Sequence, residues 1–211
     1  ADIAEVNYEH GAAIHLYQNG KTLLPPEALL IRLHIERQLG NLHFLRREYR
    51  DAKTCYEAML EFAVCAGDEV KRAIALNRLG RTHVATGDLD LGRKLLLKSI
   101  EVFREQSDMR GIASCLDDLG RLQIRMGDNK DLNEAQAHFE KALQIREQLA
   151  DKRSVALSHY LIGDVLYQMG HLRQAHERFM QSLDLRRDVE DRQGIAESLV
   201  GIGLVLAEFG R

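Results

Sequence analysis

Apolar residues recur along this chain in a pattern that repeats about every 40 residues. In each repeat an apolar residue is followed by glycine, and these pairs are Leu39-Gly40, Leu79-Gly80, Leu119-Gly120, Ile162-Gly163 and Ile202-Gly203. The steps between successive glycines are 40, 40, 43 and 40 residues, so one repeat carries a three-residue insertion, which falls within GDNKDLNEA between Gly127 and Ala135. A fixed period of this length indicates an array of stacked repeats.

Within a repeat, the apolar spacing predicts two helices. In the second repeat Asp68 is placed to cap a first helix that carries Ala73 on its apolar stripe, and the segment ATGD ends that helix at Gly87. A second helix follows, with Gly92 and Leu96 on its inner face. The pattern predicts an all-α protein. Its repeats occupy about residues 28–67, 68–107, 108–150, 151–190 and, in part, 191–211, after an N-terminal helix and linker in residues 1–27.

The glycines of the apolar-Gly pairs are predicted to be points of close helix contact. Small and large residues alternate on the inner face of each second helix, as at Ala175 and Phe179, so a large side chain fills the space that a glycine leaves on its neighbour. The segment GIGLVLAEFG has the G-x-G spacing of a dinucleotide-binding loop. However, Gly203 occupies the repeat slot of Gly80, and no strand precedes it. The periodicity therefore favours a packing glycine over a phosphate-binding one.

The repeat resembles the tetratricopeptide repeat. The matching positions are the apolar-Gly pair, the large residue three positions later, the small residue twelve positions after the glycine, the aromatic four further on and the Ala or Ser three beyond that. The resemblance covers about residues 28 to 211. The repeat is ~40 residues here rather than the ~34 usual for the family, which is similar to the long repeats of bacterial signalling proteins and eukaryotic scaffold proteins. The resemblance implies antiparallel helix pairs stacked into a right-handed superhelix, an α-solenoid whose concave groove binds peptides.

Composition and charge narrow the classes of partner. Of the 211 residues 29% are charged, and the formal net charge of -3 gives no reason to expect a nucleic-acid partner. No apolar run reaches the ~18–20 residues that a membrane span needs. The three cysteines lack the spacing of metal ligands, which favours reduced thiols in a cytoplasmic protein. We therefore expect neither a nucleic-acid nor a membrane partner.

No constellation of residues indicates catalysis, a metal or a cofactor. His43 and His83 share a repeat slot that calls for a large residue, so packing accounts for both. The segment DNKD at residues 128–131 lacks the sixth-position glycine and the twelfth-position glutamate of a calcium loop. Neither a P-loop nor a G-x-S-x-G nucleophile motif occurs. We expect a protein that is not an enzyme and has no cofactor.

The resemblance also implies which side chains line the groove. By register, the slots three before and one after each repeat glycine face inward, and the next turn adds Phe44, Val84, Ile124 and Tyr167. The residues proposed from these slots are Arg37, Asn41, Asn77, Arg81, Asp117, Arg121, Tyr160, Asp164 and Tyr167. The N-terminal half is basic and suits a carboxylate, and the C-terminal half is aromatic and acidic. An alternative is that Arg81, Asp117 and Arg121 pair with one another across adjacent helices.

These features predict a non-catalytic scaffold that binds a protein or peptide segment in its groove, as the sensor or regulatory arm of a larger signalling protein. The final repeat ends after its first helix, so we expect a piece of a longer chain. One alternative is self-association into a homo-oligomer through the apolar row of this C-terminal helix. The row is Ile195, Leu199, Ile202, Leu206 and Phe209. A second alternative is a small-molecule effector site near Tyr160 and Tyr167, as in a transcriptional regulator.

Overall fold

The computed structural model describes residues 2–127 and 129–210, and these residues form helices and turns without a strand. The helices are α1 (Asp2–Thr22), α2 (Leu29–Leu45), α3 (Tyr49–Cys65), α4 (Glu69–Thr86), α5 (Leu89–Glu105), α6 (Met109–Met126), α7 (Asn129–Gln148), α8 (Lys152–Gln168), α9 (Leu172–Asp188) and α10 (Arg192–Phe209). The predicted all-α fold is confirmed. None of the described helices is both long enough and apolar enough to cross a membrane.

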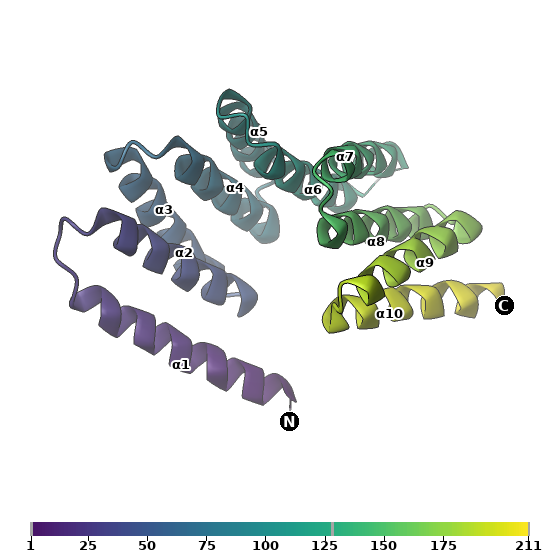
Figure 1. The fold of residues 1–211 in the computed structure, drawn as a ribbon, viewed down its shortest axis with the longest axis horizontal. Coiled ribbons are helices and arrows are strands. Elements are labelled where there is room, and N and C mark those ends of the chain that lie inside the picture. Colours follow the sequence, from purple (N-terminus) through teal and green to yellow (C-terminus); the bar gives the residue numbers. More distant parts are fainter. Residues whose placement is uncertain (1, 128, 211) are drawn as a thin grey trace. The chain divides into compact units, whose positions relative to one another are not determined.

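The helices form two compact units, coloured purple to teal and teal to yellow in Figure 1. Unit 1 (Ala1–Asp108) contains α1 to α5, and unit 2 (Met109–Arg211) contains α6 to α10. The first and second helices of each repeat pack as α2 on α3, α4 on α5, α6 on α7 and α8 on α9. The second helices α3, α7 and α9 also pack on the first helix that follows them. Stacking thus covers these second helices from two sides.

Aspartate side chains begin several of the helices. The carboxylates of Asp68, Asp151 and Asp191 accept the backbone N–H three residues later, at N···O distances of 2.9, 3.2 and 3.1 Å. Each bond satisfies a donor that the first helical turn leaves without a partner. Helix α4 ends at Gly87, whose φ of 94° lies in the left-handed region that glycine adopts without strain. The predicted cap at Asp68 and the predicted stop at Gly87 are confirmed.

The turns that lead from a second helix to the next first helix also contain a left-handed residue, directly before the aspartate. Gly67, Ser107, Ala150 and Glu190 stand one residue before the aspartate slot, and their φ values are 65°, 55°, 52° and 53°. A left-handed conformation costs a residue with a side chain about 1–2 kcal/mol. Three of these four turns therefore store strain that helix stacking offsets, and no glycine marks them in the sequence.

Paired helices approach each other most closely at the repeat glycines. A Cβ atom added at Gly120 would lie 2.5 Å from Cε1 of Phe139, and one added at Gly163 would lie 2.8 Å from Cδ1 of Phe179. Such distances are shorter than packed atoms allow, so only glycine fits beside these rings. Gly40 faces Tyr56 and Gly80 faces Leu96 in the same way. The predicted fit of a large side chain over a glycine is confirmed in four repeats.

We predict that Gly120→Leu lowers the free energy of unfolding by about 1–3 kcal/mol, because the new side chain overfills the contact with the fully buried Phe139. Gly20→Leu is the matched control, since Gly20 is also helical but nothing lies within 4 Å of an added Cβ. The free energy of unfolding of both variants is measured by urea titration, with circular dichroism as the signal. Equal losses in the two variants would contradict the close contact.

Candidate functional site

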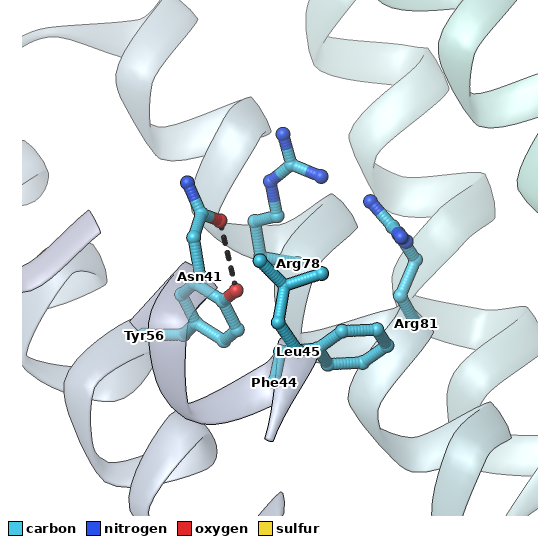
Figure 2. A pocket seen from close by; sticks show the side chains of 6 residues that line it. All are labelled: Asn41, Phe44, Leu45, Tyr56, Arg78 and Arg81. Atoms are coloured by element: carbon cyan, nitrogen blue, oxygen red, sulfur yellow. Dashed lines mark hydrogen bonds between the residues drawn. The ribbon is translucent and has the colours of Figure 1, made fainter. Parts of the chain in front are cut away.

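A pocket in unit 1 brings together side chains from three helices. Figure 2 shows the six residues that line it. They are Asn41, Phe44 and Leu45 from α2, Tyr56 from α3, and Arg78 and Arg81 from α4. The cavity has a volume of about 270 Å³. We call it the unit 1 pocket.

The contact between Gly40 and Tyr56 sets one wall of the unit 1 pocket. The Tyr56 ring is 1% exposed, and its hydroxyl donates to Oδ1 of Asn41 at 3.0 Å (Figure 2). Burial raises the pKa of Tyr56 to about 12, although the nearby Arg78 and Arg81 act to lower it. The phenol therefore stays protonated and keeps donating. Because Oδ1 accepts this bond, the Nδ2 amide group of Asn41 is the group left to donate to a ligand.

The two arginines of the unit 1 pocket come from one face of α4. Arg78 and Arg81 are three residues apart, a spacing that makes side chains neighbours on a helix. The Arg81 guanidinium carbon lies 5.1 Å from the centre of the Phe44 ring, which is a cation–π contact. Figure 2 shows the Arg78 guanidinium beside the Asn41 amide and the Arg81 guanidinium above the Phe44 ring. The pocket thus combines nitrogen donors with an apolar surface.

Two further residues proposed from the sequence lie elsewhere in unit 1. Arg37 lines a second cavity, of about 400 Å³, together with residues of α2, α3 and the start of α4. Its Nη2 lies 3.4 Å from Nδ1 of His34. Asn77 is 4% exposed and lines neither of these two cavities. The structure therefore brings Asn41 and Arg81 together in one pocket and separates Arg37 and Asn77 from it.

Asp117, in unit 2, is buried in an ion pair rather than open to a ligand. It is 3% exposed, and its two carboxylate oxygens accept from Nη1 and Nη2 of Arg146 at 3.1 and 2.6 Å. Arg146 also donates to Oγ of Ser158 at 2.6 Å. Burial raises the pKa of Asp117, while the bonds from Arg146 act in the opposite direction and favour the carboxylate. The sequence-based proposal that Asp117 faces a groove is therefore replaced by a structural role between α6, α7 and α8.

The remaining proposed residues lie on α6 and α8 of unit 2. Arg121 is largely exposed and pairs with Asp118 at 3.3 Å, not with the adjacent Asp117. The half-buried Asp164 accepts from Nε2 of Gln168 at 3.0 Å, and burial raises the pKa of its carboxyl group despite the nearby Arg121. Tyr160 and Tyr167 are half-buried on the same helix. The alternative in which Asp117 and Arg121 pair with each other is not what the structure shows.

Arg186 repeats the role of Arg146 one repeat later. Its Nη1 donates to Oγ of Ser198 at 3.0 Å and its Nη2 to Oε2 of Glu197 at 3.0 Å. Its guanidinium carbon also lies 4.9 Å from the centre of the Tyr160 ring, and Tyr160 occupies the repeat slot of Asp117. Sequence reasoning missed both buried arginines. The signal that could have found them is the shared spacing of twelve residues from each arginine to Ser158 or Ser198.

One cluster within the described part of the chain has the residue types of a metal site. His43, Glu48 and Asp51 offer ligand atoms that all lie within 4.8 Å of one another. Nδ1 of His43 is already 2.6 Å from Oε2 of Glu48. The equivalent pair in the next repeat, His83 and Asp88, also meets across its turn, at 3.3 Å. A repeated bond that closes the turn between two helices accounts for the histidine, so we assign no metal to the cluster.

Comparisons with known proteins show which proteins this chain resembles in sequence and in fold. Residues 128–188 match the family model described as tetratricopeptide repeat. No curated protein sequence matches the chain. The structure is similar to that of BtubC (BKLC) from P. vanneervenii, at a TM-score of 0.71 and 14% identity, covering 100% of this chain and 85% of that one.

Two further structural neighbours were solved with a bound partner. A Rap protein complexed with Competence and Sporulation Factor aligns at a TM-score of 0.79 and 14% identity, over 95% of this chain and 54% of that chain. NprR in complex with its cognate peptide NprX aligns at a TM-score of 0.70 and 16% identity, over 97% of this chain and 62% of that chain. This chain thus spans little more than half of either neighbour. At such identities the likeness shows a shared fold.

We predict that Asp117→Ala lowers the free energy of unfolding by about 3–5 kcal/mol, because Arg146 then keeps a buried charge without its partner. The double variant Asp117→Leu with Arg146→Leu costs less than the single change, since it removes both charges. Urea unfolding of the three chains tests the pair. If Asp117→Ala is as stable as the wild type, the ion pair with Arg146 does not hold Asp117 in the interior. Asp117 would then again be a candidate for facing a ligand.

We predict that acid weakens the fold through His159. This side chain is 9% exposed, and its Nδ1 lies 3.2 Å from Nη1 of Arg178, which can only donate. Burial, followed by the Arg178 charge, lowers the pKa of His159 to about 4. The unfolded chain therefore binds this proton more readily, and the stability due to His159 is complete above about pH 6.5 and falls towards pH 4.

The measurement is the free energy of unfolding at pH 7 and at pH 4.5 for the wild type and for His159→Gln. The wild type should lose more stability between the two pH values than the variant does. A loss of equal size in both proteins would show that His159 is not the titrating group.

Proposed function

We propose that this chain, which is built from tetratricopeptide repeats, is a non-catalytic scaffold that binds a segment of a partner protein. We further propose that the unit 1 pocket holds a carboxylate of that segment. The observation that carries the proposal is the convergence of Asn41, Arg78 and Arg81 on one cavity.

The polar groups of the unit 1 pocket favour a ligand that accepts hydrogen bonds. Guanidinium groups carry only donors and remain charged at every physiological pH. Asn41 adds a donor, because its carbonyl oxygen is held by Tyr56. A carboxylate offers two acceptor oxygens and the opposite charge, and it can bond an arginine in a bidentate manner.

The apolar groups of the unit 1 pocket favour a carboxylate that is attached to an apolar chain. Phe44 and Leu45 line the cavity beside the arginines. A peptide supplies both parts, through an acidic side chain next to an apolar residue or through the terminal carboxylate of an apolar residue. A volume of about 270 Å³ suits one or two such side chains rather than a whole cofactor.

The structural neighbours support a peptide as the class of ligand. NprR was solved with its cognate peptide NprX, and the Rap protein with Competence and Sporulation Factor. This chain shares their fold, which offers the same kind of helix-lined surface. A role as the sensor or regulatory arm of a larger signalling protein agrees with the share of those chains that it spans, and it forms part of the proposal.

The surface of α6 and α8 in unit 2 is proposed as a separate contact region for a peptide segment. Arg121 is accessible for an acidic residue, and Tyr160 and Tyr167 offer partly exposed rings. The half-buried Asp164 already accepts a hydrogen bond from Nε2 of Gln168, and burial raises the pKa of its carboxyl group. This region therefore offers a positive charge for an acidic residue and aromatic surface for an apolar one.

The test begins with peptides selected against the chain from a random-peptide display library. We expect the selected peptides to share a carboxylate, and the double variant Arg78→Gln with Arg81→Gln to bind them at least about tenfold more weakly. The matched control is Arg50→Gln, which removes an exposed arginine of unit 1 outside the pocket. Fluorescence anisotropy measures the affinities, and circular dichroism checks that helix content is unchanged.

The result that would refute the pocket is equal affinity of the selected peptides for the double variant and for Arg50→Gln. Replacing the shared carboxylate of a selected peptide by the corresponding amide provides a second measurement. This change should weaken binding to the wild type and have little further effect on binding to the double variant.

A further inference from the structure

Two cavities of unit 1 follow one another along the same pair of helices. We call the cavity that Arg37 lines, with its volume of about 400 Å³, the Met59 cavity. On both α2 and α4 its lining residues precede those of the unit 1 pocket. Helix α3 contributes one buried side chain to each, Met59 to the Met59 cavity and Tyr56 to the unit 1 pocket. The two cavities therefore lie in series between α2 and α4.

The inner surface of the Met59 cavity is apolar. Leu33 is 2% exposed and Met59 is fully buried, and the half-buried Val70 and Ile74 complete this surface from α4. An apolar side chain that enters such a cavity removes apolar surface from water on both partners, which favours binding. The volume of the cavity suits one large apolar side chain.

The polar groups of the Met59 cavity are largely paired with one another. Lys71 forms an ion pair with Asp68, and Nη2 of Arg37 lies 3.4 Å from Nδ1 of His34. The unit 1 pocket differs, because its described lining residues include two arginines and no acidic side chain. A carboxylate is therefore attracted more strongly to the unit 1 pocket than to the Met59 cavity.

The separation of the two cavities defines a spacing for their ligand. Leu33 and Asn41 are eight residues apart on α2, and so are Val70 and Arg78 on α4. At the rise of an α-helix, eight residues span ~12 Å. An extended chain advances ~3.3 Å per residue, and every second side chain points to the same face. Two side chains four residues apart in an extended segment therefore match both the distance and the direction.

A contact across the two helices favours an extended segment over a helical one. The Arg81 guanidinium carbon of α4 lies 5.1 Å from the centre of the Phe44 ring of α2 (Figure 2). An α-helix with its side chains is ~10–12 Å across, so it would have to open this contact to reach the Asn41 amide between α2 and α4. A single extended backbone is narrower and leaves the contact in place.

We propose that the partner segment binds in an extended conformation along α2 and α4, with its carboxylate in the unit 1 pocket and a large apolar side chain, four residues away, in the Met59 cavity. Arg37, one helical turn before Asn41, donates to backbone carbonyl oxygens between these two anchors. The inference rests on the proposed function and adds to it a second anchor and a fixed spacing.

The first test is an alanine scan of the tightest peptide selected against the chain from a random 12-residue display library. Fluorescence anisotropy measures its binding to the full chain. We expect two positions at which alanine weakens binding at least about tenfold, namely the carboxylate residue and an apolar residue four positions away. If the carboxylate is the terminal one, amidation of the C-terminus has the same effect, and the four residues are counted from there.

The second test fills the Met59 cavity from the side of the chain. Val70→Phe places a larger side chain at a half-buried lining position, and Val64→Phe is the matched control because Val64 is 58% exposed and lines neither cavity. Val70→Phe should keep the wild-type helix content in circular dichroism and bind the peptide at least about tenfold more weakly. It should cause little further loss for the peptide whose apolar anchor is already alanine. Val64→Phe should bind as the wild type does.

The outcomes separate this inference from the proposed function. If Arg78→Gln with Arg81→Gln weakens binding but no apolar residue of the peptide matters and Val70→Phe binds normally, the second anchor is refuted and the unit 1 pocket stands. An apolar anchor seven or eight residues from the carboxylate indicates a helical segment and overturns the extended one. Equal affinity for the double arginine variant and for Arg50→Gln refutes the pocket and this inference together.

Discussion

The close approach of two helices at a glycine is the contact on which the rest of this structure depends. A repeat glycine removes the side chain that would keep the helices apart, and a large residue of the next helix takes its place. The fit determines the distance and the rotation between the two helices of a pair. In the first repeat it also builds the proposed site, because the Tyr56 ring that covers Gly40 carries the hydroxyl that orients Asn41. Helix packing and the proposed site therefore share one side chain.

The two units use different chemistry at one equivalent slot of their second helices. Unit 1 has Ala63 and Phe103 there, and both are buried. Unit 2 has Arg146, whose guanidinium group bonds to residues of α6 and α8, and Arg186, whose guanidinium group stacks on Tyr160. A buried charge tolerates few alternative partners, so these arginines fix the register of α6 to α10 more narrowly than an apolar contact does. The arginines of the unit 1 pocket, Arg78 and Arg81, are instead half-buried beside Asn41 and Phe44.

The periodicity of the sequence was sufficient to predict the helix pairs, the caps and the glycine contacts. These features depend on residue type at fixed spacing, and spacing is visible without coordinates. The positions of individual polar side chains were predicted less well. Register placed Asp117 on a groove, but a bidentate bond to Arg146, 29 residues away, draws it into the interior. That bond depends on rotamers and on a partner from another helix, neither of which a repeat pattern contains.

Arg78 lines the unit 1 pocket, but the sequence analysis did not place it among the site residues. Its repeat slot holds Gly201 in the last repeat, which faces Phe179 and is a packing position, so register gave no reason to expect a pocket residue there. The backbone of Arg78 stands at this packing position, but its long side chain extends away from it and reaches the cavity beside Asn41 (Figure 2). The left-handed turns at Ser107, Ala150 and Glu190 were missed for a related reason, because neighbouring structure imposes a backbone shape that those residues do not favour.

The bond from Tyr56 to Asn41 has a consequence for how the protein responds to acidity. The phenol stays protonated up to a pKa of about 12, and the arginines of the same cavity keep their charge over the whole range in which proteins work. No lining residue of the unit 1 pocket changes its protonation state near neutrality. At the unit 1 pocket, the capture of the proposed carboxylate therefore depends on acidity through the titration of that carboxylate and not of the pocket.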